Sequence, residues 1–189
     1  MSTRQIIEPL ALAARGRTLE GHMPLASLAR LLPLLAGTDP QGEVEYQLEF
    51  GADEGGNPRI IGSVTATLPL VCQRCMESMV HSVTTRTRLG IVSSQRAAEQ
   101  LPERYEPLLV PAEEQGELGA GELPLATLIE DELILALPQV AMHRTEECPR
   151  GEAFLGSAPD GDEDGSVAQR ENPFAVLAQL KSTPSEQND

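Results

Sequence analysis

The sequence has few aromatic residues, few cysteines and few basic residues. It contains no Trp, two Tyr and three Phe, so a core has to be built mainly from Leu, Val, Ile and Ala. Fourteen Lys and Arg stand against 29 Asp and Glu, which gives a net charge of −15 at pH 7. A surface of that charge does not wrap a nucleic-acid backbone on all sides. At 189 residues the chain has room for one domain and a tail.

Long hydrophobic segments are also missing. No apolar run approaches the roughly 20 residues that span a bilayer. The N-terminal stretch is interrupted by Glu8 and Pro9 and does not read as a signal peptide. Three Cys in such a chain favour reduced thiols or a metal site over a disulfide framework. We therefore expect a cytoplasmic protein without membrane contact.

Sequence signatures of common enzyme classes are absent. There is no GxSxG nucleophile turn, no phosphate-binding GxxxxGK[ST] and no zinc-protease HExxH. Only His22, His81 and His143 could serve as bases at neutral pH, and no sequence spacing ties them to a nucleophile. The sequence therefore predicts a protein that is not an enzyme and has no small-molecule substrate.

A strict alternation of apolar and polar residues predicts a half-buried β-strand at residues 43–50. The apolar members, which we expect to face the core, are Val44, Tyr46, Leu48 and Phe50. Similar patterns predict a second strand around residues 60–68 and a third around 79–92, after a turn at two cysteines. Neighbouring strands with short connections form an antiparallel β-meander. The expected fold class is α+β.

Helical patterns surround these strands. We expect a short helix at residues 24–35 that ends or kinks at Pro33, and a short helical stretch near 95–100. Residues 124–137 give the strongest helix prediction, because a leucine-rich stripe follows a proline suited to a first turn. The acidic cluster at 130–132 lies mostly off that stripe, so we predict that it faces solvent.

The composition divides the chain into three parts. Residues 1–148 are predicted to form a single α+β domain, and 149–170 a partly disordered, acidic and flexible linker. Residues 171–189 hold a short helical motif and a tail. A helix of about ten residues is marginal alone, so this motif is expected to dock on its own domain or on a partner. The residues assigned to that C-terminal docking motif are Asn172, Pro173, Phe174, Leu177 and Leu180.

The three cysteines suggest a metal site. Cys72 and Cys75 form a CxxC pair, and His143 with Cys148 adds two further ligand types, which completes the four ligands of structural zinc. His81 is an alternative ligand. Two other interpretations stay open: a turn whose thiols are simply buried, and a redox pair. The redox interpretation is the weakest, because strands are predicted on both sides of the CxxC.

A second candidate site is a basic stretch in the acidic chain. Residues 72–96 carry four Arg against one Glu. Arg86 and Arg88 alternate onto one strand face, and Arg74 lies in the adjoining turn. Guanidinium groups suit contact with phosphates or carboxylates, so we predict that these three bind RNA or a partner protein. Pairing with nearby Glu residues is the alternative. No aromatic residues are interleaved to stack on bases.

Four segments, in order along the chain, resemble one known family. They are residues 68–75 (Leu-Pro-Leu-Val-Cys-Gln-Arg-Cys), 101–107 (Leu-Pro-Glu-Arg-Tyr-Glu-Pro), 129–138 (Ile-Glu-Asp-Glu-Leu-Ile-Leu-Ala-Leu-Pro) followed by His143 and Cys148, and 172–181 (Asn-Pro-Phe-Ala-Val-Leu-Ala-Gln-Leu-Lys). This pattern is similar to that of the bacterial large ribosomal RNA subunit accumulation proteins, the YceD family. Residues 1–60 match that family only in general pattern.

The resemblance implies a non-enzymatic role in the synthesis, processing or stability of 23S rRNA and hence in large ribosomal subunit assembly. The implied partner is a pre-large-subunit particle, contacted through 23S rRNA, a basic ribosomal protein or both. The resemblance does not say whether the cysteines bind zinc. The alternative function is a zinc-dependent or thiol-based protein-interaction module that is linked to ribosomes only indirectly.

Overall fold

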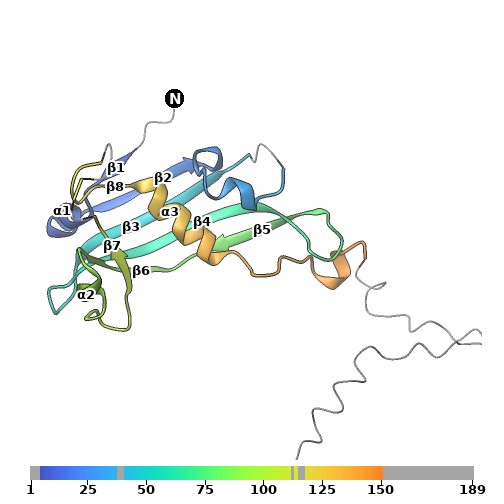
Figure 1. The fold of residues 1–189 in the computed structure, drawn as a ribbon. Coiled ribbons are helices and arrows are strands. Elements are labelled where there is room, and N and C mark those ends of the chain that lie inside the picture. Colours follow the sequence, from blue (N-terminus) through green and yellow to red (C-terminus); the bar gives the residue numbers. More distant parts are fainter. Residues whose placement is uncertain (1–4, 38–40, 112, 115–117, 151–189) are drawn as a thin grey trace, which may run out of the picture. The chain divides into compact units, whose positions relative to one another are not determined.

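A computed structural model describes residues 5–37, 41–111, 113–114 and 118–150. These residues form an α+β fold, in which a mostly antiparallel sheet carries one long helix across one face (Figure 1). The predicted fold class is confirmed. The C-terminal docking motif and all but the first two residues of the predicted linker lie outside the described residues.

The main sheet has six strands, in the order β2-β3-β4-β6-β7, and β5 pairs with β4 on the same edge as β6. Every pair is antiparallel except β6–β7, which is parallel. The strands are β2 (Thr18–Pro24), β3 (Glu43–Ala52), β4 (Pro58–Val71), β5 (Ser78–Thr84), β6 (Thr87–Val92) and β7 (Glu106–Leu109). Two short strands, β1 (Ile6–Ile7) and β8 (Leu123–Pro124), pair with each other.

The strand predicted from alternation is β3. All four of its apolar side chains are buried, and the polar side chains between them are exposed. This pattern gives the sheet an inner, apolar face and an outer, polar face. The strand predicted at residues 60–68 is confirmed as part of β4.

The strand predicted at residues 79–92 is two strands, β5 and β6, which lie end to end along β4. The break falls at Thr85 and Arg86. There the Thr85 hydroxyl accepts a hydrogen bond from the Val64 backbone N–H at 3.2 Å, while the Thr85 N–H donates to the Val64 carbonyl at 2.8 Å. The Thr85 hydroxyl therefore takes the place of a backbone carbonyl in one of the hydrogen bonds between β4 and the neighbouring chain. The predicted alternation of buried and exposed residues continues across the break.

The helix predicted at residues 24–35 is wrong. This segment follows strand β2 and forms two single 3₁₀ turns, η1 (Leu25–Ser27) and η2 (Leu32–Leu34). Leu28 between them has φ −96° and ψ 77°, outside the helical region. Leu25, Leu28 and Leu31 are nevertheless fully buried. Their spacing of three residues fits two 3₁₀ turns as well as it fits one α-helix.

The helix predicted at residues 124–137 is α3 (Leu125–Ala136), with Leu125, Leu128, Ile129 and Leu133 buried. Pro124 precedes it in an extended conformation. The shorter helices are α1 (Pro9–Ala14), α2 (Gln95–Ala98) and the 3₁₀ turn η3 (Thr145–Glu147). None of the helices in the described part of the chain is long and apolar enough to cross a membrane.

The acidic cluster of α3 does not simply face solvent, and the prediction for Glu130 is wrong. Glu130 is only 5% exposed and accepts hydrogen bonds from the Arg30 backbone N–H at 2.7 Å and from Arg30 Nε at 2.9 Å. Asp131 accepts from Arg30 Nη1 at 2.8 Å. The Thr87 hydroxyl donates to Glu132 at 2.7 Å. The acidic cluster therefore connects α3 to the segment between the 3₁₀ turns η1 and η2, through Arg30, and to β6, through Thr87.

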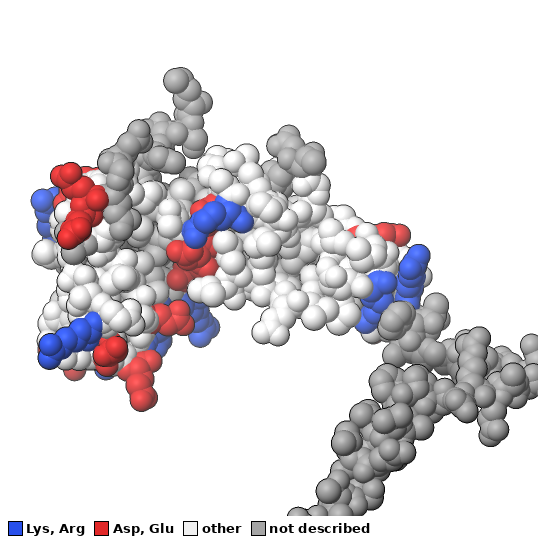
Figure 2. All heavy atoms as spheres, in the orientation of Figure 1, with Lys and Arg blue, Asp and Glu red and all other residues white. Residues whose placement is uncertain are grey.

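Charged side chains on the face that carries α3 are sparse. Figure 2 shows small groups of mixed sign there, separated by uncharged surface. The electrostatic fields of opposite charges in contact largely cancel, and salt screens what remains beyond a Debye length of about 8 Å at physiological ionic strength. This face therefore offers no extended region of one charge.

Candidate metal centre

The first two cysteines lie in the tight turn between β4 and β5. The Cys72 N–H donates to the Glu77 carbonyl at 2.9 Å, and the Met76 N–H donates to the Cys72 carbonyl at 2.8 Å. Met76 adopts a left-handed φ of 64°, which non-glycine residues rarely do. The turn places Cys72 and Cys75 on the same side, with both side chains buried.

The second pair arrives on the segment after α3. The Ala141 carbonyl accepts a hydrogen bond from the Gln73 N–H at 2.8 Å, which holds this segment against the β4–β5 turn. The 3₁₀ turn η3 then folds the chain back, and the Cys148 N–H donates to the Arg144 carbonyl at 3.0 Å. His143 and Cys148 thereby reach the first pair.

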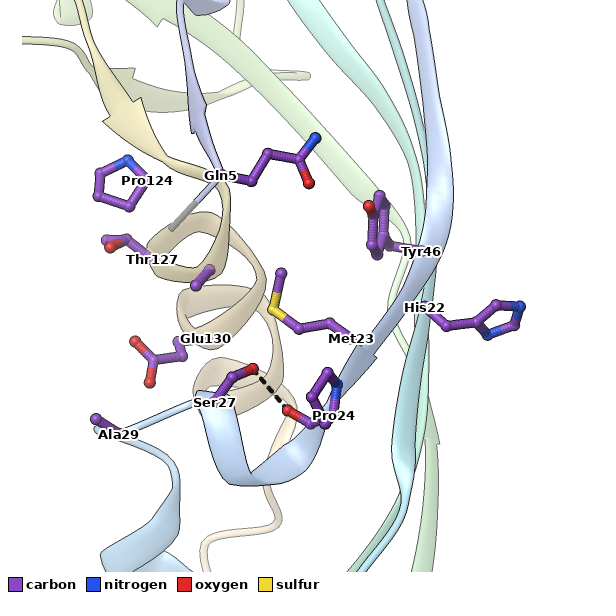
Figure 3. Close-up of a pocket in the computed structure, with 11 residues that line it drawn as sticks. Gln5, His22, Met23, Pro24, Ser27, Ala29, Tyr46, Pro124, Thr127 and Glu130 are labelled. Carbon is purple, nitrogen blue, oxygen red and sulfur yellow. Dashed lines mark hydrogen bonds between the residues drawn. The ribbon is translucent and has the colours of Figure 1, made fainter. Parts of the chain in front are cut away.

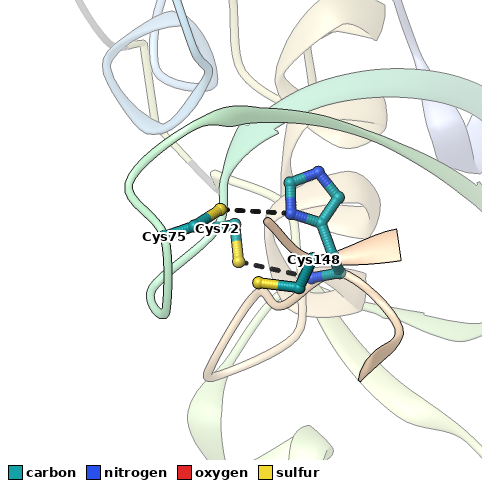
Figure 4. A group of neighbouring side chains, drawn as sticks. Cys72, Cys75 and Cys148 are labelled. Atoms are coloured by element: carbon teal, nitrogen blue, oxygen red, sulfur yellow. Dashed lines mark hydrogen bonds between the residues drawn. The ribbon is translucent and has the colours of Figure 1, made fainter. Parts of the chain in front are cut away.

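All four predicted ligands come together (Figure 4). Their ligand atoms all lie within 4.8 Å of one another. The Cys75 Sγ is 3.4 Å from His143 Nδ1, and the His143 backbone N–H donates to the Cys72 Sγ at 3.4 Å. Tetrahedral zinc with Zn–S bonds near 2.3 Å needs sulfurs about 3.8 Å apart. These side chains are positioned to bind a metal.

Burial and hydrogen bonding shift the pKa values of the Cys72 and Cys75 thiols in opposite directions. Burial raises the pKa of Cys72, but backbone N–H donors from Cys75, His143 and Arg74 stabilise its thiolate and bring the pKa down to about 5. Burial first, and then the neighbouring thiols, raise the pKa of Cys75. A cation can replace the protons that the crowded thiols retain, so the cluster has the chemistry of a thiolate metal site.

The geometry separates the three interpretations of the CxxC pair. Strands β4 and β5 flank it, so no helix N-terminus lowers the thiol pKa as in thioredoxin-like redox sites. A turn with merely buried thiols does not account for a histidine nitrogen that faces Cys75. His81, on β5, pairs with Leu68 of β4 and does not belong to the cluster of Cys72, Cys75, His143 and Cys148. The metal interpretation fits the arrangement best.

The three predicted arginines fall in two places. Arg74 belongs to the metal-site turn. Its Nη2 is 3.8 Å from the Met142 sulfur, and its Nη1 is buried without a hydrogen-bond partner among the described residues. Arg86 and Arg88 lie exposed at the β5–β6 junction. On β4, Val71 lies opposite Ser78, which begins β5, and Ile61 lies opposite Arg88. These two positions are ten residues apart, so about 33 Å of strand separates Arg88 from the end of the sheet that holds the Arg74 turn.

A cavity of about 420 Å³ lies between α3 and the strands β2 and β3 (Figure 3). Sequence reasoning did not anticipate it, because it depends on how far the helix stands from the sheet. Met23 and Tyr46 point into it, whereas His22 points away from it. Its carboxylate, Glu130, is already bound by Arg30. Among the described residues that line the cavity, there is therefore no free carboxylate.

Fold and site together define a small α+β protein with a buried three-cysteine, one-histidine metal-type cluster at one end of its sheet. The model of the family described as large ribosomal RNA subunit accumulation protein YceD matches residues 60–181. The large ribosomal RNA subunit accumulation protein YceD of Haemophilus influenzae is 33% identical over 177 residues, which cover 93% of this chain and 94% of that protein. The chain belongs to the YceD family, as the sequence motifs predicted. No solved structure matches it.

Proposed function

We propose that this protein is a non-enzymatic factor in the accumulation of large-subunit ribosomal RNA. It acts in the synthesis, processing or stability of 23S rRNA and so supports large ribosomal subunit assembly. The observation that carries the proposal is the similarity, along 93% of the chain, to a relative of that name. The place of action is the cytoplasm. The partner is the pre-large-subunit particle, through 23S rRNA, a basic ribosomal protein or both.

Several polar groups that could serve catalysis are engaged in structural contacts, which supports a role without catalysis. Arg30 binds Glu130, the Thr87 hydroxyl binds Glu132, and His143 lies in the cysteine cluster. In this proposal Arg86 and Arg88, and separately Arg74, contact RNA or a partner protein.

Depletion of the protein in cells tests the proposed function. We expect the ratio of 23S rRNA to small-subunit rRNA to fall, and expression of the wild-type chain to restore it. An empty vector is the control. If the ratio of 23S rRNA to small-subunit rRNA stays unchanged after complete depletion, the proposed function is wrong.

The cysteine cluster is proposed to hold structural zinc. Three thiolates and one imidazole complete four-coordinate zinc and leave no open position, as in structural rather than catalytic sites. His143 would bind through Nδ1, because this atom faces the Cys75 sulfur. The bound ion would join the β4–β5 turn to the segment after α3.

Elemental analysis of protein purified without a metal-binding tag tests the zinc proposal. We expect about one zinc per chain, as four ligands require, and its loss in Cys75→Ser. His81→Ala is the matched control, because His81 lies outside the cluster, and it should retain the metal. Zinc well below one per chain, with all three thiols freely reactive, would contradict the proposal.

A further inference from the structure

The outer face of the sheet separates its charges, unlike the face that carries α3. Its acidic half lies on β2 and β3, where the outward side chains include Glu20, Glu43, Glu45 and Glu49. From β4 to β6, the outward positions hold no carboxylate. Two adjacent surfaces of opposite character therefore share one side of a single sheet.

A continuous row of outward side chains runs along β5 and β6. Both strands pair with β4 end to end, and exposed residues alternate with buried ones across the break at Thr85. The row consists of Ser78, Val80, Ser82, Thr84, Arg86 and Arg88. At about 3.3 Å per residue, the row is about 33 Å long. Five of its six members carry hydrogen-bond donors.

The two arginines of this row are available for a ligand. No ion pair joins Arg86 or Arg88 to a carboxylate within the described part of the chain. The alternative prediction, that nearby Glu residues neutralise them, therefore has no support in these contacts. Arg59 on β4, by contrast, forms an ion pair with Glu49 of the acidic half, with Arg59 Nη2 3.9 Å from Glu49 Oε1.

We propose that this row binds the sugar–phosphate backbone of RNA, an inference that rests on the proposed function and adds a defined surface to it. Arg86 and Arg88 form ion pairs with phosphates, and the Ser82 hydroxyl donates a hydrogen bond to a backbone oxygen. The hydroxyls of Thr84 and Thr65 lie 3.2 Å apart, and the one that is not the donor of that bond offers a further donor. The carboxylates of β2 and β3 repel the polyanion and confine it to the β5–β6 side.

The chemistry of the row favours the backbone of RNA over its bases. Tyr46 and Phe50, the aromatic side chains of β3, point to the core, and the outward positions from β2 to β6 hold no Phe, Tyr or Trp to stack on a base. Donors repeated along an extended line suit an extended polyanion. Binding should therefore depend little on base sequence.

Fluorescence anisotropy with a labelled RNA hairpin of arbitrary sequence tests the row on the full chain. With two phosphates neutralised, log K should fall with log salt with a slope of about −1.4 to −1.8. Arg86→Glu with Arg88→Glu should weaken binding about tenfold or more at low salt and remove most of that slope. Ser82→Ala with Thr84→Val should weaken it less. Circular dichroism confirms that each variant is folded.

Arg15→Glu with Arg17→Glu is the matched control, because these are also exposed arginines two residues apart and the charge change is equal. The proposal predicts a loss of no more than about twofold in this control, from net charge alone. Equal losses in both double variants, or no binding of RNA by the wild type at low salt, would overturn it. Tighter binding of polyglutamate than of RNA would also overturn it, in favour of an acidic protein.

Complementation separates this inference from the proposed function. If Arg86→Glu with Arg88→Glu restores 23S rRNA fully in depleted cells, the row is not the working RNA contact, whereas the role in rRNA accumulation stands. If the same variant fails while the Arg15 and Arg17 control restores it, the row is supported. If depletion of the wild-type protein leaves 23S rRNA unchanged, the proposed function itself fails.

Discussion

Helix α3 and the segment that follows it are attached to the sheet by different kinds of interaction. The helix buries four apolar side chains on the sheet, and its buried Glu130 forms an ion pair with the half-exposed Arg30. The following segment, residues 138–148, leaves Val140 and Met142 largely exposed. Its attachments are one backbone hydrogen bond to Gln73, a weak contact of Arg74 with the Met142 sulfur, partial packing of Ala141 on the core and the cysteine cluster. The position of the helix therefore follows from burial, whereas that of the segment depends on the cluster.

The largest expected effect is the loss of one of the proposed zinc ligands. Cys148→Ser should release residues 138–150, because little apolar burial holds them once metal binding is lost. We expect trypsin to cleave after Arg144 about tenfold faster or more, as local opening becomes frequent. Chelation of the wild-type protein should have the same effect.

Cleavage after Arg15, far from the cluster in sequence, serves as the internal control and should keep its rate. Gln139→Ala, an exposed change in the same segment, should behave as wild type. If Cys148→Ser and chelation both leave the cleavage after Arg144 unchanged, the segment does not depend on the cluster and the contrast with α3 disappears.

A smaller effect is expected at the helix. Arg30→Ala leaves the buried carboxylate of Glu130 without its charged partner and keeps only the backbone N–H donor of residue 30. Loss of the charged partner costs about 3–5 kcal/mol at fully buried pairs. Because half of the Arg30 side chain is exposed, we expect about 2 kcal/mol in the free energy of unfolding. Urea denaturation measures this value.

Two further variants separate the effect of the buried charge from that of losing an arginine. Glu130→Gln keeps a hydrogen-bonding side chain and should cost less than Arg30→Ala, because no charge is left buried. Arg96→Ala removes an exposed arginine and should change stability by less than about 0.5 kcal/mol. If Arg30→Ala were no more costly than Arg96→Ala, burial alone would position α3.

The same contrast explains which features the sequence could predict. Strand β3 follows from alternation within ten residues, and the main stripe of α3 follows from its own spacing. The four residues of the cysteine cluster were predicted to lie together because all three cysteines had to be placed and four-coordinate zinc limits the choices, and the structure does bring them together. These features depend on local periodicity or on a short list of chemically special residues.

The features that were missed depend on distant contacts. Glu130 is buried because Arg30, 100 positions away, binds it, and no local pattern contains that information. Strand β2 includes Gly21 and Pro24, which weaken a strand pattern, and its pairing with β3 decides its conformation. Arg74 and Arg88 were grouped by sequence proximity, but β5 and β6 continue end to end along β4, and this extended run places the two arginines at its opposite ends.

The smallest effect is expected where hydrogen bonds without large apolar burial hold a segment. Asp53, in the loop between β3 and β4, accepts hydrogen bonds from the N–H groups of Gly55 and Asn57 at 2.9 Å and from Arg104 at 2.8 Å. The bonds from Asn57 first, and then Arg104, lower the pKa of Asp53 to about 2. The folded pKa lies below the unfolded value of about 3.9. Its stabilisation is therefore complete above about pH 5 and is lost as pH falls toward 2.

Asp53→Asn should thus be less stable than the wild type at pH 6, and the difference between their urea midpoints should shrink steadily between pH 5 and pH 2.5. Glu54→Gln, a neighbouring exposed acid, is the matched control and should track the wild type over the same range. A difference between Asp53→Asn and the wild type that stays constant with pH would mean that shape, and not the charge of Asp53, holds this loop. In that case the loop would resemble α3, whose attachment rests mainly on burial, more than the cluster-dependent segment after it.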